Sequence, residues 1–261
     1  MATASNIDFR TSQSYALGFG VSGALAAGAL NATAARDLVL GRLNVQVDTP
    51  LDNTFGQITA ITVQGASILA SNQPCDIRGF HTSLQMDENF IGVPLVQNGV
   101  IQFQWANLAA AAAVSGAVYA DPWTQDLGEP PSPDESGPSS LNYAFGMGSV
   151  VIGAGATVNL QATALRACVL GRLFLSAYDV GGNTYALERS CQVQQILINQ
   201  TEQLSSQVNA SVPLSTFGLN ALSSMANLNQ FVPMNGTVTI AVTNNSVGPL
   251  TVSGHFFCNA S

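Results

Sequence analysis

"LNATAARDLVLGRL", residues 30–43, returns later in the chain as "LQATALRACVLGRL", residues 160–173, with 10 of the 14 positions identical. A shorter motif lies upstream of each copy, as "SYALGFG" at 14–20 and "NYAFGMG" at 142–148. Near the end of each copy stands "AVSGAVY" (113–119) or "TVSGHFF" (251–257). Self-similarity at a fixed period is the signature of a repeated structural unit. The sequence therefore predicts a chain built from two copies of one unit.

Apolar and polar residues alternate in several segments of both copies, which is the pattern of half-buried β-strands. The alternation is clearest in residues 43–48, 58–63, 100–105 and 237–242, and Asn-Gly pairs at 98–99 and 235–236 mark turns. Each copy has the same order: an opening strand with the Tyr-Ala-x-Gly-x-Gly motif, a segment that ends at Val-Leu-Gly-Arg-Leu, further strands, a loop with Val93-Pro94 or Val232-Pro233, and a closing hairpin. We predict an all-β fold.

One segment has a different period. Residues 214–231, "LSTFGLNALSSMANLNQF", place apolar side chains at spacings of two to three, and Ser215 or Thr216 is available as an N-cap. The segment predicts a helix late in the second copy. The matching place in the first copy, around residues 82–90, is shorter and more acidic.

The repeat also predicts how the chain is divided. We expect an N-terminal arm over residues 1–13, a first unit over 14–120, a linker over 121–140 and a second unit over 141–261. The linker holds five prolines and five of the 15 acidic residues, so it is neither a central strand nor a helix.

Charge is scarce in this chain. Charged residues make up 8% of it, all seven cations are arginines, and the net charge is −8. Direct contact with nucleic acid or with an anionic membrane needs a basic face, so we expect neither. The first ten residues lack the basic and apolar stretches of a secretory signal, and none is expected. Four cysteines without a C-x-x-C spacing are expected as buried free thiols: Cys75, Cys168, Cys191 and Cys258.

Catalytic motifs are absent from the sequence. The two histidines, His81 and His255, have no acid at catalytic spacing, and no nucleophile elbow, phosphate-binding loop or zinc-protease motif is present. We predict that the protein is not an enzyme and holds no cofactor, with His255 a satisfied structural histidine in a strand. A divalent cation on the acidic linker is the alternative, but the spacing fits no EF-hand and favours a solvated loop.

Arginine recurs at two matched positions, Arg36 with Arg166 and Arg42 with Arg172. The two positions of each copy are six residues apart, so within one strand they would share a face. Two interpretations remain open. Each arginine binds carbonyls or an acid inside its own unit, or it forms a contact between subunits, where the guanidinium suits bidentate pairing. These four arginines are the candidate site residues.

Two β units of about 130 residues, joined by a linker and each with a late helix and a final hairpin, resemble a known family. They are similar to the double jelly-roll major capsid proteins of tailless icosahedral viruses with an internal membrane, and in size to those of corticovirus and finnlakevirus phages. The resemblance spans residues 14–257 and lies in size, duplication and strand order. It implies two tandem eight-stranded jelly rolls, each of two facing sheets, with a short helix late in each unit.

The resemblance also implies a function. The chain would be a structural virion protein, a major capsid subunit whose homotrimers are pseudo-hexameric and tile an icosahedral shell over a lipid vesicle. Its partners would be the other chains of the trimer, neighbouring capsomers and minor capsid or membrane proteins, and assembly would take place in the host cytoplasm. Because the chain has no lysine, lipid contact by its inward-facing arm is expected to be indirect.

Two other functions remain open. A secreted or surface β-sandwich adhesin or glycan-binding protein would carry a signal peptide and exposed aromatics repeated in both copies, but Trp105 and Trp123 are not repeated. A duplicated-barrel enzyme of the bicupin type needs two or more histidines and a carboxylate in one barrel. Each half of this chain has one histidine, so the sequence disfavours this function.

Overall fold

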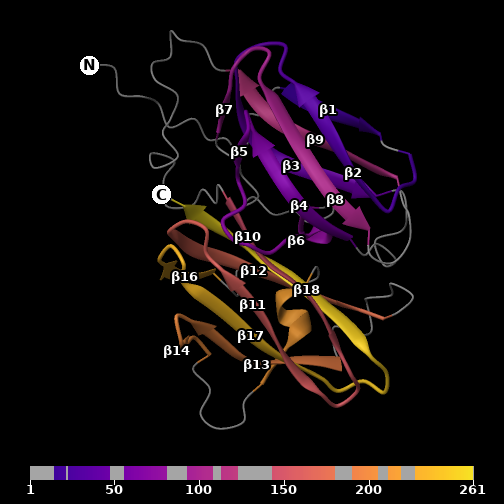
Figure 1. Cartoon of the computed structure of the whole chain (residues 1–261), viewed down its shortest axis with the longest axis vertical. Helices are drawn as coiled ribbons and strands as arrows, with labels where there is room; N and C mark the ends of the chain where they lie inside the picture. The colour runs from indigo at the N-terminus through magenta and orange to yellow at the C-terminus, as the bar shows by residue number, and fades with distance from the viewer. Residues whose placement is uncertain are drawn as a thin grey trace.

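The chain folds into two β units that lie one above the other along the long axis of the molecule (Figure 1). The computed structural model describes residues 15–21, 23–47, 56–80, 93–107, 113–122, 143–179, 190–204, 211–218 and 227–260. Nearly all of the secondary structure in these ranges is β-strand. No helix among them is long and apolar enough to cross a membrane.

The described residues of the first unit form two sheets. One sheet has the strand order β1-β9-β3-β7, and the other has the order β2-β8-β4-β5, with β6 also paired to β4. A short 3-10 helix, η2, follows β6. The bounds of these elements are β1 (Tyr15–Val21), β2 (Ala27–Thr33), β3 (Leu38–Val47), β4 (Gly56–Val63), β5 (Ala66–Ser67), β6 (Cys75–Asp76), η2 (Ile77–Phe80), β7 (Pro94–Leu95), β8 (Val100–Asn107) and β9 (Val114–Pro122).

The second unit repeats this arrangement element by element. Its sheets have the orders β10-β18-β12-β16 and β11-β17-β13-β14, with β15 also paired to β13. The 3-10 helix η5 follows β15. The bounds are β10 (Tyr143–Ile152), β11 (Thr157–Thr163), β12 (Cys168–Tyr178), β13 (Cys191–Ile198), β14 (Thr201–Glu202), β15 (Val212–Pro213), η5 (Leu214–Phe217), β16 (Asn227–Val232), β17 (Thr237–Asn244) and β18 (Leu250–Ala260).

This strand order is that of a jelly roll. In each unit the first and last long strands are neighbours in one sheet, while the second and the second-to-last are neighbours in the other. The short β5 and β14 extend the fourth strand as a hairpin and add to the eight strands of the basic fold. The prediction of an all-β chain with two tandem jelly rolls, and a short helix late in each, is confirmed.

Irregularities of the strands are also repeated. Register shifts occur at matched places in the first, third and fourth strands of both units. In the third strand the shift lies between Leu40 and Leu43 in one unit and between Leu170 and Leu173 in the other. The repeated Val-Leu-Gly-Arg-Leu motif therefore marks a β-bulge, which bends a strand and increases its twist.

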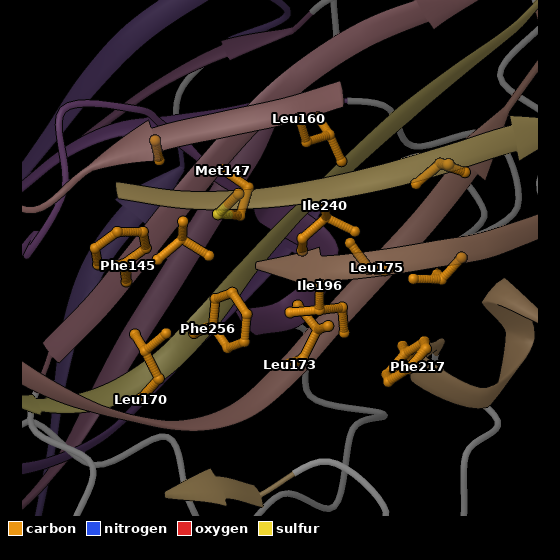
Figure 2. Close-up of a cluster of buried hydrophobic side chains, with 14 of the residues drawn as sticks. Phe145, Met147, Leu160, Leu170, Leu173, Leu175, Ile196, Phe217, Ile240 and Phe256 are labelled. Carbon is orange, nitrogen blue, oxygen red and sulfur yellow. The ribbon is translucent and has the colours of Figure 1, made fainter. Parts of the chain in front are cut away.

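Each unit buries its core between its own two sheets. Figure 2 shows part of the second core, where Leu173 of one sheet and Ile196 of the other point into the same cluster, together with Phe145 and Phe256. The first core contains the fully buried Phe103. All four cysteines are buried and free of disulfides, as predicted.

The helix predicted over residues 214–231 is wrong in its extent. Within this segment, only η5 is helical among the described residues, its N-cap position is Pro213 instead of Ser215 or Thr216, and residues 227–232 form β16. Pairing with the edge of β12 overrides the weak helical period, and Phe231 is 59% exposed instead of facing a core. Residues 219–226 and the matching acidic segment at 82–90 lie outside the described residues.

The predicted closing hairpins are not hairpins. β17 pairs with β11 and β13, whereas β18 pairs with β10 and β12, so the connection between them crosses from one sheet to the other, and β8 and β9 are related in the same way. Alternation shows that a strand is half buried but does not identify its partner.

Three further expectations concern segment boundaries. The Val-Leu-Gly-Arg-Leu motif lies inside a third strand, and Pro94 and Val232 lie in strands instead of a loop. β9 continues through Asp121 and Pro122, the first two residues of the predicted linker. The rest of that linker and the predicted arm over residues 1–13 lie outside the described residues.

Candidate functional site at the contact between the units

One segment of the first unit reaches across to the second. Residues 66–80, here called the bridging segment, contain β5, β6 and η2, and lie against the sheet β10-β18-β12-β16 (Figure 1). Three kinds of contact join the segment to this sheet: backbone hydrogen bonds, a cluster of buried polar side chains, and stacked aromatic rings. This contact between the units is the candidate functional site.

The backbone of the bridging segment extends the edge of β10. Leu69 forms a parallel bridge with Ala144. The Ala70 N–H donates to the Ala144 carbonyl at 2.8 Å, and the Ala144 N–H donates to the Ile68 carbonyl at 3.2 Å. The carbonyl of Ala70 in turn accepts from the Leu165 N–H at 2.8 Å. An edge strand of the second unit is thus covered by a segment of the first, which satisfies backbone groups that a sheet edge leaves open.

The glycines of the Tyr-Ala-x-Gly-x-Gly motif permit this close approach. A Cβ atom at Gly146 would lie 2.1 Å from the carbonyl oxygen of Gln73, a distance that no side chain tolerates. Gly148 has a φ of +71° and donates its N–H to the Pro74 carbonyl at 3.0 Å. The hydroxyl of Ser71 donates to the Gly146 carbonyl at 2.7 Å. In the second unit, the motif is therefore a binding site for the first unit.

Arg166 is the candidate arginine that this contact contains. Its Nη2 donates to the carbonyl of Ser67 at 3.0 Å, and its guanidinium lies 4.6 Å from the ring centroid of Tyr143. A guanidinium over an aromatic face is held by the ring quadrupole as well as by the hydrogen bond. Arg166 thus binds a carbonyl of the other unit, whereas the sequence offered a partner in its own unit or in another subunit.

The other candidate arginines lie elsewhere. Arg36, which matches Arg166, is exposed in the loop after β2. Arg42 and the half-buried Arg172 lie at the bulges of β3 and β12. The two arginines of each copy do not lie in one strand, because Arg36 precedes β3 and Arg166 precedes β12, so the condition for a shared face is not met. A contact of these arginines with another subunit stays a prediction.

A buried carboxylate joins the units below the glycine motif. Asp76 of the bridging segment accepts hydrogen bonds at 2.5 Å from the hydroxyls of Ser176 and Tyr178 on β12, and at 2.9 Å from the Arg78 N–H. The Arg78 guanidinium lies 5.4 Å from the centroid of the Tyr178 ring. Burial, together with the charge of Asp76, raises the pKa of Tyr178, so its hydroxyl keeps its proton as a donor. All four side chains are buried.

His255 of β18 lies in an aromatic box. Its ring is stacked on Phe80 of η2 at a centroid distance of 5.1 Å, and it contacts Phe174 at 5.3 Å and Phe257 at 4.8 Å. Neither ring nitrogen has a hydrogen-bond partner in the described structure. Burial lowers the pKa of His255 to about 3, so the ring is neutral. The expectation of a structural histidine agrees with this position, but the expectation that it is satisfied is wrong.

This polar cluster was not found from the sequence, although it contains an acid, an arginine, a serine and a tyrosine. Asp76 and Tyr178 are about a hundred positions apart, and no repeated motif includes them. All of these side chains are buried. The described residues contain no group of three or more His, Cys, Asp or Glu that could hold a metal ion. His81 lies outside the described residues.

The cores of the two units are continuous across the contact. Ala144, Phe174 and Phe257 of the second unit belong to the core cluster of the first. Ala70 of the first unit belongs to the core cluster of the second. Shared apolar burial and the hydrogen bonds above make the two jelly rolls one body.

Comparisons with known proteins give structural similarities alone. No family model and no curated protein matches the sequence. Among solved structures, the chain is similar to the major capsid protein P2 from bacteriophage PM2, with a TM-score of 0.42 and 8% identity, over 95% of this chain and 97% of that chain. It is also similar to a chain in the atomic structure of Sulfolobus Turreted Icosahedral Virus, with a TM-score of 0.35 and 8% identity, over 88% and 90% of the two chains.

Proposed function

We propose that this protein is a major capsid subunit, which assembles as a homotrimer and tiles an icosahedral viral shell. The observation that carries the proposal is the fusion of two jelly rolls of the same strand order into one body through a sealed contact. Three such chains supply six similar jelly rolls. A trimer of a single protein therefore has a pseudo-hexagonal outline with six similar edges. The side chains of the polar cluster at the contact are buried, which fits a structural role.

Composition supports the same function. With 8% charged residues and many small polar ones, the surface suits extensive contact with copies of itself, since charged residues are depleted from the centres of interfaces. We further propose that the protein is located in the virion shell and assembled in the host cytoplasm. Minor capsid or membrane proteins would then mediate lipid contact, because a chain with a net charge of −8 has little attraction for anionic headgroups.

Native mass spectrometry and negative-stain microscopy of the purified full chain test this function together. We expect a dominant species of three chain masses that appears as a hexagonal particle and forms larger arrays as the protein concentration rises. A species that remains a monomer under all assembly conditions would overturn the proposal.

A further inference from the structure

The first unit carries the same binding motif as the second, but no described residue covers it. Gly18 of β1 matches Gly146 of β10. A Cβ atom at Gly146 would collide with the bridging segment, whereas a Cβ atom at Gly18 would meet no atom within 4 Å, and Gly18 is exposed. Contacts inside the chain explain the glycine of the second copy but not Gly18 of the first. The repeated glycine therefore points to a partner outside the chain.

The edge of β1 is open in the same way. β10 pairs with β18 on one side and receives the bridging segment on the other. β1 pairs with β9 on the matched side, and no described segment pairs with its other edge. An open edge that presents backbone donors and acceptors is a ready template for another strand.

The second unit has the counterpart of the segment that would fill this edge. β14 matches β5, and both hairpins are exposed. The turn after each strand is capped alike: the Leu69 N–H donates to the Ser67 hydroxyl at 3.1 Å, and the Leu204 N–H donates to the Glu202 carboxylate at 2.9 Å. The two segments thus share a local structure as well as a place in the fold.

Charge and position also suit the pairing. Arg36 stands where Arg166 stands in the second unit, and Glu202 stands where Ser67 stands in the first. Inside the chain, Arg166 pairs with Ser67. Between two copies, the matched pair is Arg36 of one chain and the acidic Glu202 of the other. β1 and β14 lie towards opposite ends of the long axis of the molecule, so one chain does not make this contact with itself (Figure 1).

We propose that the open edge of β1, with Gly18 and Arg36, binds residues Thr201–Leu204 of a second copy of this chain. The inference rests on the proposed function and names the contact that builds its oligomer. By the matched contacts inside the chain, the Ala16 N–H donates to the neighbour's Gln203 carbonyl, and Arg36 donates to the neighbour's Glu202 carbonyl. A head-to-tail contact of this kind generates a ring when its rotation closes.

Cross-linking between two singly substituted proteins tests the contact. Ala16→Cys and Leu204→Cys occupy the positions that match the bridged pair Ala144 and Leu69. The two variant proteins are mixed, assembled and oxidised with copper phenanthroline. A disulfide between the two introduced cysteines then joins two different chains. We expect a linked dimer in the mixture at a yield about tenfold or more above either protein alone. The matched control replaces Leu204→Cys by Val247→Cys, a fully exposed position in the β17–β18 connection, and should give background yield.

A second variant tests the contact without a cross-link. Gly18→Val places a side chain where the chain itself leaves room, so at a protein concentration too low for trimers the unfolding midpoint should stay that of the wild type, while trimer association at higher concentration weakens about tenfold or more. If Gly18→Val assembles normally and the Ala16 and Leu204 variants do not link, this contact is wrong but the capsid function stands. If the wild-type chain stays monomeric, both proposals fail.

Discussion

At the scale of single residues, the contact between the units contains two buried polar side chains, one with several hydrogen-bond partners and one with none in the described structure. Asp76 accepts three hydrogen bonds, two from hydroxyls and one from the backbone, so its charge is compensated. His255 has apolar neighbours and no hydrogen-bond partner for its ring nitrogens in the described structure. The Asp76 carboxyl is satisfied by these donors, whereas burial lowers the pKa of His255 and keeps its ring uncharged.

Replacing His255 with leucine should therefore reduce the loss of stability in acid. The pKa of His255 is about 3 in the folded chain and 6.5 in its ordinary state, so the unfolded chain takes up the proton first as the pH falls. The free energy of unfolding is unaffected above pH 6.5 and falls by about 1.4 kcal/mol for each pH unit below it, until the folded pKa is reached. Denaturant unfolding of both proteins from about pH 7 to about pH 5 measures this difference.

Carboxylates that titrate in this range affect the wild type and His255→Leu alike, so the difference between the two slopes belongs to the histidine. Asp76 and Arg78 lie in the same contact and are present in both proteins. Parallel curves for the two proteins would contradict the prediction.

The hydroxyl of Tyr178 should contribute measurably to stability. Tyr178→Phe removes one of the donors to Asp76 and leaves the buried carboxylate with fewer partners, which costs about 1.5–3 kcal/mol for a hydrogen bond to a charged group. Tyr143→Phe is the matched control, because it keeps the ring that stacks on Arg166, and its cost should stay below about 0.5 kcal/mol. Equal free energies of unfolding for the two variants would show that the carboxylate does not depend on this donor.

At the scale of elements, strands were predictable and their partners were not. Alternation identified β4, β8 and β17, because each has one face on a core. The pairing of β17 with β11 rather than with β18 depends on sheets that form between segments far apart in the chain. The same reason explains β16, where pairing with β12 overrides a local helical period.

The two Asn-Gly turns offer a test at this scale, because they are repeated with the same geometry. Asn98 and Asn235 have φ values of +64° and +65°, and each donates its N–H to an alanine carbonyl, Ala34 or Ala164. Replacing either asparagine with valine should cost about 1–2 kcal/mol, since a β-branched residue is strained in the left-handed region. Glycine at the same positions should be nearly neutral.

Chemical denaturation of the four single variants measures these costs. Valine variants as stable as the glycine variants would show that the turns can leave the left-handed backbone conformation at little cost in free energy.

At the scale of the whole molecule, the repeat predicted two jelly rolls but not what joins them. Arg166 was found because it is repeated, and it lies in the contact. Asp76 and Tyr178 were missed, and the stacking of His255 on Phe80 was not predicted, because the sheets, and not the sequence spacing, bring these residues together. A residue that serves only one copy carries no repeat signal, so a contact made once in the chain is hidden from comparison of the copies.

The contact predicts that the two jelly rolls unfold in one transition. Each core cluster contains residues of the other unit, and the bridging segment cannot leave β10 without breaking the bonds of Ala70 and Asp76. Calorimetry of the wild type, at a protein concentration too low for trimers, should give a calorimetric enthalpy equal to the van't Hoff enthalpy, the criterion for a two-state transition of a monomer. Gly146→Ala puts a Cβ atom 2.1 Å from the Gln73 carbonyl oxygen and must open the contact, so two transitions should appear.

Gly18→Ala is the matched control for Gly146→Ala. It distinguishes a steric clash in the contact from the general effect of replacing a glycine in a strand. It changes the matched residue at a place where a Cβ atom meets nothing, and at the same low protein concentration it should keep the single transition at the wild-type midpoint. Two transitions in Gly146→Ala with one in Gly18→Ala would locate the cooperativity in the contact between the units. One transition in both variants would mean that the units are coupled elsewhere, and two in the wild type would mean that they fold independently despite their shared cores.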